Sequence, residues 1–147
     1  MIDVHVVGSR PSICSVPLLT TAVEQSFRAA RITAKGDVSI AFVSDKKMRS
    51  LNRTWRKKDR STDVLSFAPS DGPRASNAPH DWGDIVVSPS FVRTESRRRR
   101  IAFREELLRV IIHGMLHLMG HDHATIREER VMFGMQERAL KRTLLTV

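Results

Sequence analysis

The sequence predicts a single α+β domain that extends over residues 1–147. Segments with the alternating pattern of strands are mixed with segments of helical periodicity, and the chain ends in helices. A length of 147 residues suits one domain with a real hydrophobic core, and no internal repeat or second domain is apparent. We therefore expect about four strands packed with about five helices.

The first half of the chain alternates strands with helices. Pro11 and Pro17 are expected to bracket a loop before the first helix. Gly36 and Asp37 form a turn signal ahead of the next alternating segment. In order, we expect a strand at 2–7, a helix at 18–32, a strand at 38–43 and a short helix that starts at a Ser44–Asp45 cap and runs toward Trp55.

The second half begins with a basic loop that contains Arg56 and leads into a short strand at 63–67. Residues 69–81, rich in Pro, Gly and Asn, predict a flexible surface loop. After them we expect a strand at 83–88, a helix that starts at Pro89 and ends in four arginines, a buried helix from Glu106, and a last amphipathic helix behind a capping box at Thr125 and Glu128.

The buried helix carries the pattern H-x-x-x-H-x-x-G-x-x-H over residues 113–123. His113 and His117 are four residues apart, which places both imidazoles on one helix face. Gly120 suits the left-handed residue that ends a helix, so the chain can fold back and bring His123 to the same point. Three imidazoles in this arrangement predict a zinc site with an open fourth position. His121 points elsewhere and is not included in the ligand set.

The motif resembles the zinc-protease helix but lacks one of its residues. Zinc proteases place a glutamate directly after the first histidine as the general base. Gly114 occupies that position here, and no carboxylate replaces it in the helix. The pattern therefore argues against peptide hydrolysis.

The chain is strongly basic, with 25 Lys and Arg against 16 Asp and Glu and a formal net charge of +9. Such a field favours a polyanionic partner, nucleic acid first, although a merely solvated basic surface is the alternative. Arg97, Arg98, Arg99 and Arg100 form a local cluster beside the histidine helix and are candidates for RNA binding. Aromatic residues make up only 5% of the chain, which argues against a platform for base stacking.

The chain has one cysteine, Cys14, which excludes an internal disulfide and suits a reducing cytoplasm. The strand pattern that follows Met1 predicts no signal peptide, and no apolar run approaches a membrane span. A cytoplasmic protein is therefore expected.

Two segments together identify a family resemblance. The chain resembles the YbeY family of bacterial endoribonucleases in ribosomal RNA maturation, through His113–His123 as H-G-x-L-H-L-x-G-x-D-H. A second segment matches at Leu51, Asn52, Trp55, Arg56, Asp59 and Thr62–Phe67, and shorter matches occur at Gly83–Ile85, Met132, Phe133, Gln136 and Glu137. The resemblance runs from about residue 37 to the C-terminus.

The resemblance implies a mixed sheet, one zinc ion per chain on His113, His117 and His123, and single-stranded RNA as the substrate. It also implies a role in maturation of the small-subunit ribosomal RNA and in ribosome quality control, with the ribosome or its proteins as partners. The resemblance further implies that Arg56 is the basic residue that lies in the cleft with the metal. There it would stabilise negative charge on a phosphoryl group, whereas a surface or bracing role is the alternative.

Two carboxylates are candidates to support the metal ligands, because a ligating histidine commonly donates its other N–H to a carboxylate. Asp122 is adjacent to His123, and Glu106 lies two turns before His113 on the same face. An ion pair of Glu106 with Arg109 or Arg60 is the alternative.

Two functions of other classes remain open from the sequence. One is a non-catalytic ribosome-assembly factor in which zinc is structural and the basic face binds RNA. The other is a metallohydrolase for a small or peptide substrate, which Gly114 and the positive charge both disfavour.

Overall fold

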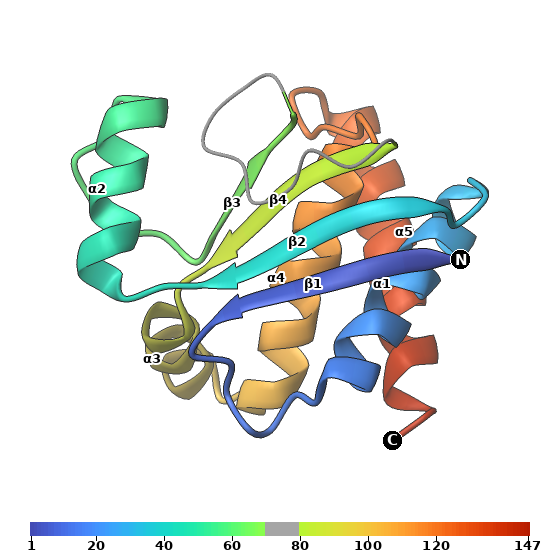
Figure 1. Cartoon of the computed structure of the whole chain (residues 1–147), viewed down its shortest axis with the longest axis horizontal. Coiled ribbons are helices and arrows are strands. Elements are labelled where there is room, and N and C mark those ends of the chain that lie inside the picture. Colours follow the sequence, from blue (N-terminus) through green and yellow to red (C-terminus); the bar gives the residue numbers. More distant parts are fainter. Residues whose placement is uncertain (70–79) are drawn as a thin grey trace.

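The computed structural model describes residues 1–69 and 80–147, which form one four-stranded mixed sheet and the helices around it (Figure 1). The strand order is β1-β2-β4-β3. β1 pairs with β2 and β2 with β4 in parallel, and β3 is antiparallel to β4. The strands are β1 (Ile2–Gly8), β2 (Gly36–Phe42), β3 (Val64–Phe67) and β4 (Asp81–Val87).

Helices pack on both faces of the sheet. Three of them, α1, α4 and α5, lie together on one face, where most of the buried apolar side chains gather (Figure 1). On the other face Met48 and Leu51 of α2 pack against Phe67 and Val86 of the sheet. The helices are α1 (Val16–Ala30), α2 (Asp45–Arg56), α3 (Pro89–Arg99), α4 (Phe103–Leu118) and α5 (Ile126–Leu144).

The fold agrees with the predicted α+β class, with its mixed sheet, its strand and helix order and its histidine helix. Several helix starts use the side chains that the sequence indicated. Ser44 accepts a hydrogen bond from the backbone N–H of Lys47, and Thr125 accepts one from Glu128. These caps satisfy N–H groups that have no partner within the helix.

Several boundaries differ from the expectation, and the histidine helix α4 starts at Phe103, three residues before the expected Glu106. Pro17 lies inside the first turn of α1 rather than in the loop before it, because a proline there sacrifices no helical hydrogen bond. β4 starts at Asp81, two residues earlier than expected. α2 continues to Arg56, so the prediction that Arg56 lies in a loop is wrong. The expected loop at 69–81 falls largely outside the described residues.

The close approach of α4 to the sheet is made possible by Gly114. A Cβ atom at this position would lie 2.9 Å from Ile85 Cγ2, 3.1 Å from Ser66 Oγ and 3.3 Å from Val64 Cγ2. The hydroxyl of Ser66 donates a hydrogen bond to the carbonyl oxygen of Gly114 at 2.9 Å. The histidines of α4 are thereby held beside β3.

Candidate metal centre and active-site cleft

His113, His117 and His123 converge on one point. One nitrogen of each ring lies within 4.8 Å of the others, and the Nε2 atoms of His113 and His117 are 3.0 Å apart. The first two rings come from successive turns of α4, as their spacing predicted. This part of the sequence prediction is confirmed by the geometry.

The third ring arrives through the turn that ends α4. Gly120 has φ +95°, a conformation that glycine adopts without strain. The N–H of Gly120 donates to the carbonyl of His117, and the N–H of His121 donates to that of Leu116. These two bonds close a Schellman-type end, which reverses the chain and returns His123 to the helix.

The protonation of the rings suits a metal ligand. Burial is the main cause that lowers the pKa of His117, and the neighbouring His113 and His123 lower it further. Nδ1 of His113 lies 2.7 Å from Oε1 of Gln136, which can only accept, so Nδ1 is the donor in this hydrogen bond. Nε2 of His113 therefore presents its lone pair to the other two rings. Three imidazoles with converging nitrogens fit a zinc ion.

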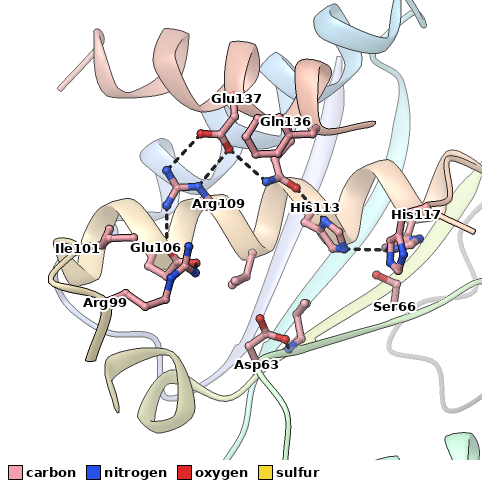
Figure 2. Close-up of a pocket in the computed structure, with 14 residues that line it drawn as sticks. Asp63, Ser66, Arg99, Ile101, Glu106, Arg109, His113, His117, Gln136 and Glu137 are labelled. Carbon is pink, nitrogen blue, oxygen red and sulfur yellow. Dashed lines mark hydrogen bonds and ion pairs between the residues drawn. The ribbon is translucent and has the colours of Figure 1, made fainter. Parts of the chain in front are cut away.

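A network of charged side chains supports His113 from α5. Gln136 donates through Nε2 to Glu137, and both carboxylate oxygens of Glu137 accept from Arg109 of α4 at 3.1 and 3.2 Å. Figure 2 shows Arg109 lying between Glu137 and Glu106. Neither Gln136 nor Glu137 has a role predicted from the sequence beyond the family match. The spacing of Gln136 and Glu137 beside the buried stripe of an amphipathic helix could have indicated that they face α4.

Glu106 takes the ion-pair role that the sequence had left as its alternative. Its carboxylate accepts from Arg109 at 2.6 Å and from Arg99 at 3.4 Å. The prediction that Glu106 accepts a hydrogen bond from the imidazole of His113 is therefore wrong. Nδ1 of His113 faces Gln136 instead. The physical reason is that Arg109, one turn further along α4, meets the buried carboxylate first.

Asp122 is exposed next to the triad. Its Oδ1 accepts a hydrogen bond from the backbone N–H of His123 at 2.7 Å, and its charge opposes the fall in the pKa of His117. The side chain thus braces the turn that carries His123.

Arg56 and His117 line one cavity of about 310 Å³, together with residues of β3. The guanidinium of Arg56 donates from Nη2 to the carbonyl oxygen of Ser66 at 2.5 Å, and its Cζ lies 4.8 Å from the centre of the Phe67 ring. The side chain is exposed, so it is oriented by β3 without being buried. Arg56, the last residue of α2, thus shares a cavity with one histidine of the triad.

A second cavity of about 520 Å³ opens from the triad in the direction of α3. Figure 2 shows its walls, with Asp63 and Ser66 below α4 and with Gln136 and Glu137 above it. The two cavities share the side chains of Val64, Ser66 and His117. The triad therefore lines the larger cavity, and its His117 lies where the two cavities meet.

The four clustered arginines are exposed at the end of α3. Arg98 pairs with Glu95 of its own helix at 2.5 Å, whereas Arg99 reaches Glu106 and lines the larger cavity. Arg100 ends the helix in the left-handed region with φ +57°. The structure thus brings Arg99 to the cleft.

Comparisons with known proteins agree with this geometry. The family model described as Endoribonuclease YbeY matches residues 15–144. The chain belongs to the YbeY family. A relative from Geobacillus thermodenitrificans named Endoribonuclease YbeY is 34% identical over 137 residues, which cover 89% of this chain and 88% of the relative.

Two further relatives of the same name and one solved structure extend the comparison. The protein from Geobacillus kaustophilus is 41% identical over 75% of this chain and 74% of its own length. The protein from Myxococcus xanthus is 39% identical over 71% of this chain, which spans only 35% of that longer relative. The solution structure of TM1509 from Thermotoga maritima matches with a TM-score of 0.64 and 29% identity, over 95% of this chain and 88% of that one.

Within this YbeY-family chain, the described residues include no helix long and apolar enough to cross a membrane. The buried thiol of Cys14 has its pKa raised to about 11, mainly by burial. Cys14 is therefore a protonated core residue at neutral pH.

Proposed function

We propose that this chain is a zinc-dependent endoribonuclease that cleaves single-stranded RNA. The observation that carries the proposal is the convergence of three histidines in one cavity, which adjoins through His117 a second cavity that contains Arg56. The names of the relatives support the same reaction class. The biological substrate we propose is small-subunit ribosomal RNA, during maturation and ribosome quality control in the cytoplasm, with the ribosome or its proteins as partners.

His113, His117 and His123 would hold one zinc ion per chain. A bound zinc ion supplies Lewis acidity and lowers the pKa of water, from 15.7 toward about 7. Gln136 keeps the proton of His113 on Nδ1, so that Nε2 stays available to the metal site. Arg56 stabilises the negative charge that builds on the phosphoryl oxygens, because its guanidinium is always protonated and oriented by Ser66.

Peptide hydrolysis is disfavoured by the packing around Gly114. The position that carries the general base in zinc proteases faces Ile85, Ser66 and Val64 across a gap too small for a side chain. The residue type supplies no general base there, and the short helix–sheet distance disfavours a larger side chain.

The second candidate is a ribosome-assembly factor in which zinc is structural. The net charge of +9 favours it as much as it favours a nuclease, since both bind RNA. The two candidates differ in whether removal of the metal abolishes RNA cleavage or only stability.

The test is metal analysis combined with RNA cleavage. We expect about one zinc per chain, cleavage of a generic single-stranded RNA, and loss of cleavage with a chelator or in a His117→Ala variant purified identically. His121→Ala is the matched control, because His121 lies four residues from His117 outside the triad. Equal cleavage by His117→Ala would identify a contaminating nuclease, and the assembly-factor function would replace the proposal.

A further inference from the structure

We infer that the larger cavity beside the triad binds a nucleobase of the RNA, stacked on the ring of Phe133. The inference rests on the proposed function and adds to it a subsite for the base next to the cleaved phosphate. Neither the composition nor the resemblance indicated this subsite.

Phe133 is on α5 but outside its buried stripe. Its side chain is 60% exposed, whereas its neighbour Met132 is 2% exposed. Phe133, Gln136 and Glu137 all line the cavity, as residues three and four apart on one helix face can. A large aromatic ring exposed in a cavity wall contributes little to the core and offers accessible apolar surface to a flat ligand.

The charges in this cavity suit a neutral base better than a phosphate. Three carboxylates line it, against two guanidinium groups, and Arg109 is already paired with Glu106 and Glu137. A phosphate placed in this cavity away from the triad would meet the carboxylates. Val64 and Ile101 add apolar surface, and the volume of about 520 Å³ is large enough for a nucleotide.

The smaller cavity suits a phosphate better than a base. It contains Arg56 and adjoins the larger one at Val64, Ser66 and His117. A phosphodiester at the triad would thus have Arg56 on one side and Phe133 on the other. The sugar–phosphate backbone belongs beside Arg56, and the attached base belongs beside Phe133.

Stacking on Phe133 departs from the expectation drawn from composition. Few aromatic residues suggested that bases are not bound by stacking, but a single ring at the site suffices for one base. Stacking tolerates any base, because every base has a π-face, so sequence preference stays loose.

The experiment compares Phe133→Ala, Phe133→Trp and Val131→Ala with the wild type on a short RNA whose cleavage position has been mapped. Val131 is the matched control, because it is 52% exposed on the same helix and does not line the cavity. Phe133→Ala should raise KM on the order of tenfold, with kcat nearly unchanged, since stacking contributes equally before and during the reaction. Phe133→Trp should restore the KM, and Val131→Ala should match the wild type.

A second set of RNAs carries one abasic nucleotide at each position around the cleavage site. At one of these positions, the abasic nucleotide should raise the KM of the wild type by the same factor as the Phe133→Ala substitution does. The KM of Phe133→Ala should not rise further with that RNA. An unchanged KM in Phe133→Ala, or an undiminished abasic effect in that variant, overturns the subsite. Zinc content and melting temperature equal to wild type are also required, because a fall in either would show that Phe133 is structural.

Binding of the same RNAs, followed by fluorescence anisotropy, separates this inference from the proposed function. If the wild type binds RNA without cutting it, the nuclease proposal fails. The abasic series then still decides whether a base stacks on Phe133.

Discussion

At the scale of single residues, the candidate site depends on side chains that are oriented by one contact and keep their other atoms available. His113 uses Nδ1 for Gln136 and leaves Nε2 for the other histidines. Arg56 uses Nη2 for Ser66 and keeps its side chain exposed. In both residues one contact fixes the orientation and the rest of the group remains available for chemistry.

We predict that Gln136→Leu weakens zinc binding by roughly 10–100-fold, because Nδ1 of His113 would lose its acceptor. Gln136→Glu keeps an oxygen for Nδ1 but loses the donor to Glu137, so its affinity should lie between those of the wild type and Gln136→Leu. Competition with a chromophoric chelator measures the zinc Kd of each variant. A Kd for Gln136→Leu equal to that of the wild type would show that Gln136 does not position the ring.

Arg56→Ala is predicted to lower RNA cleavage on the order of 10²–10³-fold, since a charge-assisted contact to the phosphoryl group is lost. The melting temperature should remain nearly unchanged, because the side chain is exposed. Initial rates and thermal unfolding measure the two effects. Arg53→Ala, an exposed arginine in the same last turn of α2, is the control and should cleave normally. Unfolding or normal cleavage by Arg56→Ala would assign the role to another residue.

At the scale of elements, the site forms where α4 approaches β3 and then turns back at Gly120. The small residue at 114 sets the helix–sheet distance, and the glycine at 120 sets the direction of the chain that carries His123. α5 completes the site from the other side through Gln136 and Glu137. Two glycines and one amphipathic helix thus determine where the three rings meet.

Gly114→Ala is predicted to destabilise the protein by about 1–3 kcal/mol, because the added methyl group overpacks the contact between α4 and the sheet. Gly134→Ala is the matched control in α5. Its Cβ would meet only the flexible end of Arg138 at 3.3 Å, and alanine favours the helix by up to about 1 kcal/mol. Urea unfolding measures both changes. Equal stability of the two variants would mean that α4 can shift away from the sheet without cost.

At the scale of the whole molecule, the basic charge must act together with a cleft that contains several carboxylates. The net charge of +9 attracts RNA over a distance, whereas the acidic groups near the triad pair with Arg99 and Arg109. Cationic side chains that are not held in these ion pairs reach the solvent at the exposed ends of helices. RNA affinity should therefore depend on salt far more than cleavage chemistry does.

We predict that binding of single-stranded RNA weakens steeply with salt, and that Arg97→Ala combined with Arg100→Ala lowers the logarithmic slope. Each lost phosphate contact should reduce the slope by roughly 0.7. Arg28→Ala combined with Arg31→Ala is the control, because Arg31 ends α1 in the same left-handed conformation as Arg100 ends α3. Anisotropy titrations over a range of salt measure the slopes. A slope equal in both double variants would remove the α3 arginines from the RNA-binding surface.

The sequence by itself determined the fold class, the order of the elements and the three converging histidines. These features depend on local periodicity, on capping residues and on a fixed helical spacing, all of which can be recognised within short segments of the sequence. It also indicated the turn at Gly120, since only the identity of one residue was needed.

Only the tertiary structure decided which residues surround the triad. Gln136 contacts His113 from 23 positions away, and Glu106 contacts Arg99 and Arg109 rather than an imidazole. Phe133 became a candidate for base stacking only once its ring was found exposed in the cavity. Such contacts depend on how α3, α4 and α5 pack together, and no local pattern encodes the distance between side chains on different elements.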